Sequence, residues 1–144
     1  MAEDKIDIKS LDFMELQELL ESMGEKKFRS KQLYDWIHKN LVLSFDEMTN
    51  LSKDMRKKLA DTCTIEGARI IKKQVSSDGT AKFLMRLSDG NTVESVLMKY
   101  KHGNSVCIST QVGCRMGCRF CASTVGGLIR SLKTSEMLDQ IYEI

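Results

Sequence analysis

Three cysteines lie close together in the second half of this sequence: Cys114, Cys118 and Cys121. They belong to the segment SVCISTQVGCRMGCRFCAST, residues 105–124, which holds four of the five cysteines of the chain. Closely spaced thiolates bind soft metal centres. Structural zinc usually takes four ligands from two separated pairs, whereas a [4Fe-4S] cluster held by three cysteines leaves one iron open to a substrate or cofactor. The spacing therefore favours iron and sulfur over zinc.

Two neighbouring residues are candidates for a fourth ligand. His102 could complete a zinc site, but a lone histidine before a strand is also typical of a surface position. Cys107 lies on a predicted strand, residues 105–111, and four extended residues place it roughly 13 Å from the loop. We therefore expect Cys107 to stay outside the metal site, where it is either a small buried residue or a reactive thiol. Cys63 ends a predicted helix and is expected to be structural.

Composition indicates a folded domain. The chain has 144 residues, of which 42% are hydrophobic and 29% charged. No run of about 18 apolar residues is present, and the start MAEDKIDIKS is too polar for a secretory signal. We therefore predict a cytoplasmic protein without membrane contact. In a reducing cytosol, clustered cysteines are more often metal ligands or catalytic thiols than disulfides.

The net charge of +2 is unevenly distributed. From Lys99 to Lys133 there are six Lys or Arg residues and no Asp or Glu. Such a stretch attracts anionic partners, such as a substrate carrying phosphates. Alternatively, two of its arginines only offset thiolate charge. Basic groups also occur in the first 62 residues, where solvated surface and RNA contact are both compatible with the pattern.

Residues 1–63 predict a helical accessory domain. Apolar residues recur at helical spacing in three sets: the first two follow candidate N-caps at Ser10 and Ser30, and a further candidate cap, Ser52, lies within the third. Ser44 and Glu47 form a predicted capping box. The three sets are Phe13, Leu16, Leu20 and Met23; Leu33, Trp36, Ile37 and Leu41; and Met48, Leu51, Met55 and Leu59.

The period then changes to that of strands. Residues 64–100 predict an antiparallel meander with strands at 68–75, 82–87 and 92–98, separated by the turn signals SSDG and SDG. Residues 101–144 predict the strand 105–111, the cysteine loop and a helix capped by Thr134 or Ser135. Met137, Leu138, Ile141 and Tyr142 are the expected apolar side of that helix. The loop would then follow the carboxyl end of a strand, where α/β barrels and open parallel sheets place their active sites.

The motif Cys114-x3-Cys118-x-Phe120-Cys121 resembles that of the radical S-adenosylmethionine (SAM) enzymes. Within them, the chain resembles the RlmN family of RNA adenine C2 methyltransferases from about residue 10 to its end. Five segments carry this resemblance: GEKKFRSKQLYDWI, SFDEMTNLSKDMRKKL, SSDGTAKFLMRLSDG, VESVLM and SVCISTQVGCRMGCRFCASTVGGLIR. The sister Cfr family, which acts at C8, shares the cysteine spacing, but CASTVGGL is more similar to RlmN.

The resemblance implies both a fold and a function. The fold would be an α+β region, a small helical bundle plus a short antiparallel sheet, followed by the first βα unit of an α/β partial TIM-type radical SAM barrel. The function would be methylation of adenine C2 in 23S rRNA and transfer RNA, with a [4Fe-4S] cluster and SAM as cofactors and a flavodoxin or ferredoxin as electron donor. We expect the chain to be the N-terminal portion of a longer enzyme and to be inactive alone.

The resemblance also implies residue roles. Cys114, Cys118 and Cys121 would hold the cluster, and the backbone at Phe120 would lie beside the adenine of SAM. Glu94 would accept a proton, and Cys107 would form a transient disulfide with a distant cysteine. Without the resemblance, Glu94 would be read as an exposed strand carboxylate. The alternatives to this function are a Cfr-like C8 methyltransferase and a stand-alone iron–sulfur or zinc module that binds RNA.

Overall fold

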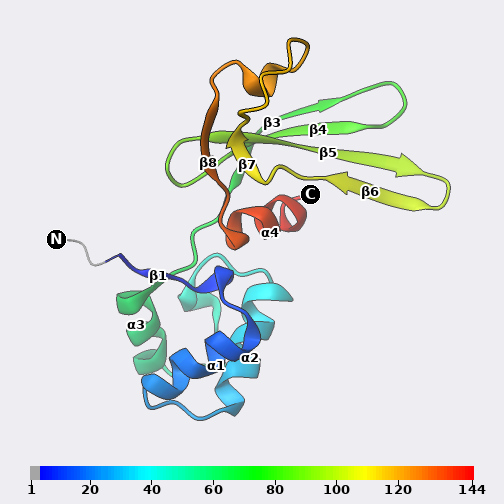
Figure 1. Ribbon diagram of the computed structural model, residues 1–144. Coiled ribbons are helices and arrows are strands. Elements are labelled where there is room, and N and C mark those ends of the chain that lie inside the picture. The colour runs from blue at the N-terminus through cyan, green and yellow to red at the C-terminus, as the bar shows by residue number, and fades with distance from the viewer. Residues whose placement is uncertain (1–3) are drawn as a thin grey trace. The chain divides into compact units, whose positions relative to one another are not determined.

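The computed structural model describes residues 4–144, and the chain divides into two compact units, Met1–Glu66 and Gly67–Ile144. Figure 1 shows helices in the first unit and most of the strands in the second. Helices and an antiparallel sheet make this an α+β fold, as predicted. None of the helices within residues 4–144 is long and apolar enough to cross a membrane.

The first unit is built on three helices, α1 (Phe13–Ser22), α2 (Phe28–His38) and α3 (Lys53–Thr62). Short 3-10 helices, η1 (Ile8–Ser10) and η2 (Phe45–Glu47), precede α1 and α3. The strands β1 (Ile6–Asp7) and β2 (Cys63–Thr64) pair in parallel and bring the two ends of the unit together. The buried core comprises Ile8, Leu16, Leu20, Leu33, Ile37, Val42, Phe45, Met48, Leu51, Met55, Leu59, Cys63 and Ile65.

The helix starts agree only partly with the predicted caps. The capping box of Ser44 and Glu47 and the N-cap at Ser52 are confirmed. The first helix is capped by Asp12 instead of Ser10, because the Asp12 carboxylate accepts a hydrogen bond from the Glu15 amide. Ser30 lies inside α2 and is buried, so it is not a cap.

The second unit contains a four-stranded antiparallel sheet in the order β3-β4-β5-β6. Its strands are β3 (Arg69–Val75), β4 (Ala81–Arg86), β5 (Thr92–Tyr100) and β6 (Gly103–Cys107). The predicted meander is confirmed, with β6 as an additional strand. A second antiparallel pair follows, β7 (Gln111–Gly113) and β8 (Leu128–Ser131), and then the helix α4 (Thr134–Tyr142). The core of this unit consists of Ala68, Ala81, Phe83, Met85, Leu87, Val93, Val112 and Leu132.

The predicted strand 105–111 is divided in the structure. Its first three residues belong to β6, which pairs antiparallel with β5 and ends at Cys107. Its last residue, Gln111, begins β7. The chain leaves one sheet and enters another across residues 108–110, so a single straight strand was the wrong prediction. The cysteine loop consequently joins two antiparallel strands, β7 and β8, and not a strand and a helix. The start of a barrel is not confirmed, and the division at residues 63 and 100 stays a prediction.

The buried face of the helix α4 is not the apolar side that the sequence predicted. Its buried residues are Ser135, Glu136, Asp139 and Gln140, whereas Ile141 is half exposed. Hydrogen bonds explain this polar burial. The Asp139 carboxylate accepts from the Ala68 amide at 3.0 Å, and the Gln140 side chain accepts from the Ser95 hydroxyl at 2.7 Å. Both of these partners belong to the sheet region, so α4 is held against it by polar contacts.

Candidate functional site

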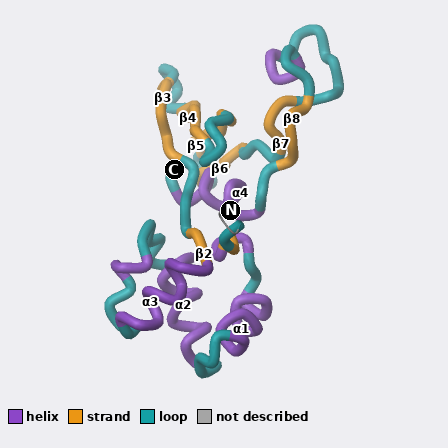
Figure 2. The backbone as a smooth tube through the Cα atoms, turned by 90° about the vertical axis from the view of Figure 1, so that its left-hand side faces the viewer, coloured by secondary structure: helices purple, strands orange, loops and turns teal. Residues whose placement is uncertain are grey.

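The cysteine loop stands off the β7–β8 hairpin, as Figure 2 shows, and is closed by its own backbone. The Cys114 amide donates to the Gly127 carbonyl at 3.1 Å, which joins the two ends of the loop. The Thr124 hydroxyl lies 3.2 Å from the Cys118 carbonyl and 3.1 Å from the Cys121 carbonyl. The backbone of the loop is therefore ordered around its second and third cysteines.

The three cysteine side chains of the loop are half-buried free thiols. Among residues 4–144, no group of three or more His, Cys, Asp or Glu side chains is placed so that it could hold a metal ion. The structure thus puts the three thiols on one short loop without gathering them about one point. Three cysteine sulfurs are nevertheless the number and the kind of ligand that a [4Fe-4S] cluster bound by three thiolates requires. The Met116 amide also donates to the Cys114 sulfur at 3.5 Å.

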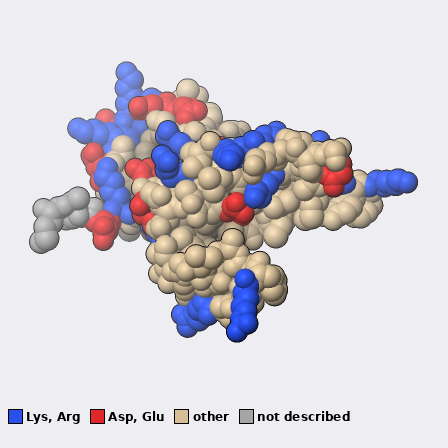
Figure 3. Space-filling model, turned by 90° about the horizontal axis from the view of Figure 1, so that it is seen from above, with Lys and Arg blue, Asp and Glu red and all other residues tan. Residues whose placement is uncertain are grey.

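The surroundings of the thiols are positively charged. No Asp or Glu occurs from residue 95 to residue 135, whereas Arg115 and Arg119 lie between the cysteines. Seen from above in Figure 3, a projecting lobe carries Lys and Arg side chains and no acidic ones. Positive charge attracts anionic ligands, so the loop is suited to binding them.

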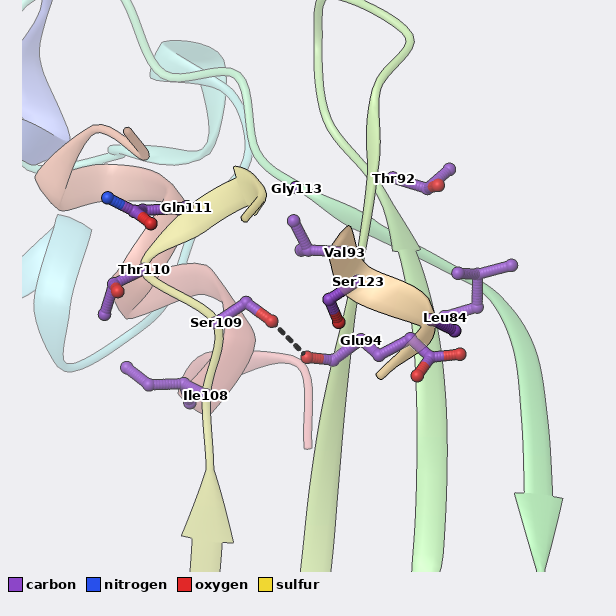
Figure 4. A pocket seen from close by; sticks show the side chains of 11 residues that line it. Leu84, Thr92, Val93, Glu94, Ile108, Ser109, Thr110, Gln111, Gly113 and Ser123 are labelled. Atoms are coloured by element: carbon purple, nitrogen blue, oxygen red, sulfur yellow. Dashed lines mark hydrogen bonds between the residues drawn. The ribbon is translucent and has the colours of Figure 1, made fainter. Parts of the chain in front are cut away.

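A pocket of about 520 Å³ lies next to this loop. Figure 4 shows the segments around it: Leu84 on β4, the start of β5 with Glu94, the stretch Ile108–Gln111, and Ser123 from the 3-10 helix Ala122–Thr124 (η3). Two further residues that line the pocket, Gly113 and Ala122, are the direct neighbours of Cys114 and Cys121. The backbone of the cysteine loop therefore forms one wall of the cavity.

Glu94 and Cys107 lie on the same face of the sheet. Cys107 pairs with Val96 across the β5–β6 ladder, and Glu94 is two residues from Val96 on the same strand. Because side chains alternate, both side chains emerge on one face as diagonal neighbours, roughly 7–8 Å apart in such ladders. Cys107 is exposed and the Glu94 side chain is 56% exposed, so both are open to a substrate.

One contact of Glu94 was not predicted from the sequence. The Lys82 ammonium lies 3.4 Å from the Glu94 carboxylate, across the β4–β5 ladder. Leu84 on β4 is the direct partner of Glu94, and Lys82 is two residues away on the same face. The register of the predicted hairpin could have placed Lys82 there. The ion pair is solvent-exposed, so it orients the carboxylate more than it stabilises the fold.

The stretch that follows Cys107 and lines the pocket is fixed by hydrogen bonds. The Ser109 hydroxyl donates to the Glu94 carbonyl at 2.7 Å, and the Gln140 side chain pairs with the Ser109 backbone. Sequence analysis did not identify Gln140, because a polar residue on an amphipathic helix is normally expected to face solvent. Phe120, by contrast, is 95% exposed and lines no part of the pocket.

Comparison with solved structures shows the class of protein in which this arrangement occurs. The crystal structure of a radical SAM methyltransferase from Sphaerobacter thermophilus matches 94% of this chain with a TM-score of 0.83 and 36% sequence identity, and the match covers 40% of that protein. The fold seen here is therefore shared with part of a radical SAM methyltransferase.

Sequence comparisons narrow the class to one family. Residues 6–65 match the family model described as "Ribosomal RNA large subunit methyltransferase N-terminal domain". A probable dual-specificity RNA methyltransferase RlmN from Lachnoclostridium phytofermentans is 62% identical over 98% of this chain, and one from Staphylococcus aureus is 52% identical over 98%. The predicted resemblance to the RlmN family is confirmed over nearly the whole chain. The chain spans about 40% of the length of these relatives.

Proposed function

We propose that this chain forms part of a radical SAM enzyme that methylates C2 of adenine in ribosomal and transfer RNA. The observation that carries the proposal is the placement of Glu94 and Cys107 on one sheet face, beside a pocket whose wall is the cysteine loop. A carboxylate and a thiol that face one substrate can remove a proton and attack a sulfur in the same reaction. The relatives named RlmN act on RNA, which supports the choice of substrate.

The cluster ligands are proposed to be Cys114, Cys118 and Cys121. A [4Fe-4S] cluster on them, together with SAM, would supply the radical chemistry that an electron-poor ring carbon requires. The backbone at Phe120 would lie along the adenine of SAM. An electron donor such as flavodoxin or ferredoxin would reduce the site, and a cytoplasmic location follows from this need.

The residues of this chain then have distinct tasks. Glu94, oriented by Lys82, accepts the proton that leaves the adenine ring. Cys107 provides the thiol that releases the product by forming a disulfide with a cysteine outside these 144 residues. Because that second thiol is missing here, we propose that the chain alone binds its cofactors but completes no methyl transfer. All five cysteines are free in the structure.

Anaerobic reconstitution with iron and sulfide tests the cluster assignment. We expect a brown protein with about four irons per chain, as for a cubane cluster. Cys114→Ala, Cys118→Ala and Cys121→Ala should each remove the colour, whereas the matched controls Cys63→Ala and Cys107→Ala should keep it. Stoichiometric zinc without colour would contradict the radical SAM assignment. With the longer enzyme, mass spectrometry of digested RNA would separate methylation at C2 from methylation at C8.

A further inference from the structure

The face that carries Glu94 and Cys107 continues to the tip of the β5–β6 hairpin. The ladder pairs Val96 with Cys107, Met98 with Ser105 and Tyr100 with Gly103, with no change of register. Since side chains alternate along a strand, Val96, Met98 and Tyr100 lie on the same face as Glu94. Tyr100 is thus aligned with the two proposed reaction residues.

The tip of the hairpin carries two stacked aromatic rings. The ring centroids of Tyr100 and His102 are 5.2 Å apart, and the ring planes differ by 6°. Tyr100 is 51% exposed and belongs to neither buried core. The Tyr100 hydroxyl points back along the strand and contacts the Met98 sulfur at 3.5 Å. The rings therefore form an exposed, flat aromatic surface that does not contribute to core packing.

The charge around these rings favours an anionic partner. Lys101 follows Tyr100 at the tip and is exposed, whereas Lys99, also exposed, extends from the opposite face of the strand, where its side chain lies beside Gly79. The acid-free stretch from residue 95 to residue 135 includes the whole tip. An exposed aromatic surface next to a lysine has the chemistry that proteins use for unpaired nucleotides, in which the ring stacks on a base and the cation holds a phosphate.

We propose that the Tyr100–His102 stack is a platform for an unpaired base of the RNA substrate, with Lys101 on an adjacent phosphate. This inference rests on the proposed function, since it takes RNA as the substrate. Tyr100 pairs with Gly103, which is four residues before Cys107 on β6. The platform is therefore roughly 13 Å from Cys107 along the extended strand. It therefore holds a nucleotide near the reacting adenine and not that adenine itself.

The test uses the 144-residue chain and an RNA stem-loop in which 2-aminopurine replaces one loop adenine. The fluorescence of 2-aminopurine falls when the base stacks, so a titration gives both the affinity and the stacking. Tyr100→Leu should weaken binding about tenfold and remove most of the quenching, as expected for the loss of one stacked base. Tyr100→Phe keeps a ring and should bind like the original chain.

Two further variants separate stacking from charge. Lys101→Gln should lower the slope of log affinity against log salt by about 1, since one phosphate contact is lost. Val75→Ala, at an exposed apolar position on β3 at the opposite edge of the sheet, should change neither affinity nor quenching. Circular dichroism melting of each variant checks that the fold is retained.

Three outcomes would overturn the platform. They are equal binding by Tyr100→Leu and the original chain, the same tenfold loss on a fully paired RNA, and an original chain that does not bind the stem-loop. None of these depends on cluster assembly or methyl transfer, so the proposed function is judged separately by reconstitution and product analysis. If the chain binds its cluster but its RNA affinity does not depend on Tyr100, only the platform proposal is contradicted.

Discussion

The side-chain amide of Gln140 pairs with both backbone groups of Ser109. Its Oε1 accepts from the Ser109 N–H at 2.8 Å, and its Nε2 donates to the Ser109 carbonyl at 2.8 Å. Ser109 lies between β6 and β7, where no strand neighbour supplies these bonds. The helix α4 thus takes the place of a missing strand partner, and it fixes the residues that join Cys107 to the pocket.

Replacement of Gln140 by leucine should loosen this segment. Leucine keeps the volume of the side chain, but it leaves the Ser109 N–H and carbonyl without these partners in a partly buried place. Such a loss costs about 1–3 kcal/mol in the free energy of unfolding. We expect faster hydrogen exchange at the Ser109 amide, measured by NMR, together with a lower urea midpoint. Gln74→Leu, on the exposed surface of β3, is the control and should leave both unchanged. Unaltered exchange at the Ser109 amide in Gln140→Leu would show that the Gln140 side chain does not hold this segment in place.

Local signals in the sequence were sufficient to predict two of the caps, at Ser44 and Ser52, and the two turns of the meander. Ser44 and Glu47, or Ser52 and the amide of Met55, interact within three residues of one another. The turns SSDG and SDG are closed by Asp78 and Asp89, whose carboxylates accept from the amides of Thr80 and Asn91. Each of these contacts depends on neighbours in the chain, so residue type and spacing are enough to predict them.

The burial of α4 and the path of the cysteine loop were not predicted, because both depend on residues that are far apart in the chain. Asp139 and the amide of Ala68 are 71 positions apart, and no pattern around either residue indicates the contact. The sequence could indicate candidate ligands, since three thiols with this spacing suggest a cluster. It could not predict how the three side chains are arranged, because the path of the loop depends on the pairing of β7 with β8. The place of the loop in the fold therefore had to come from the structure, whereas its cluster chemistry stays a prediction.

Gly113 is a position where any side chain should disturb the cysteine loop. Its φ is +76°, and an added Cβ would collide with the carbonyl oxygen of Gly127. That oxygen accepts the hydrogen bond from the Cys114 amide, so the loop closure would be displaced. We expect Gly113→Ala to cost about 3 kcal/mol, more than the 1–2 kcal/mol of a left-handed conformation alone. Gly117, with φ +70° and open space around it, is the matched control for which only the smaller cost is expected. Thermal unfolding of the two variants compares these costs, and equal losses would argue against the collision.

The five thiols should differ in their reaction with maleimide. Cys63 is 2% exposed, and burial raises its pKa, although its contact with the Thr62 hydroxyl acts in the opposite direction. Its thiolate fraction near neutral pH is therefore small, and we expect labelling at least about tenfold slower than at the accessible cysteines. After iron and sulfide are added, Cys107 should still react, whereas Cys114, Cys118 and Cys121 should be protected. Peptide mass spectrometry assigns each site, with Cys107→Ala as the control. Protection of Cys107 by the cluster would make it a ligand and contradict its proposed role.

Arg130 connects β8 to α4 through Glu136. The guanidinium donates to both carboxylate oxygens of Glu136, at 2.7 and 2.8 Å, and also to Asp89 at 2.8 Å. Burial tends to raise the pKa of Glu136, but the hydrogen bonds from Arg130 and from the Lys133 amide outweigh it, so this pKa lies below its ordinary value. The Glu136 side chain is only 7% exposed, which limits the screening of this pair by solvent.

This lowered pKa predicts how stability depends on pH. A carboxyl group whose pKa is lower in the folded state stabilises the fold fully above its unfolded pKa, about 4.3 for Glu, and loses this effect as the pH falls through the folded pKa. Glu136→Gln should therefore lower the free energy of unfolding by about 1–2 kcal/mol at neutral pH, and this deficit should shrink as the pH falls below about 4. Urea unfolding at several pH values, followed by circular dichroism, measures the difference. Glu143→Gln, at an exposed position at the end of the same helix, should show no such dependence. A deficit that stays constant from neutral to acidic pH would mean that the loss comes from packing and not from the charge of Glu136.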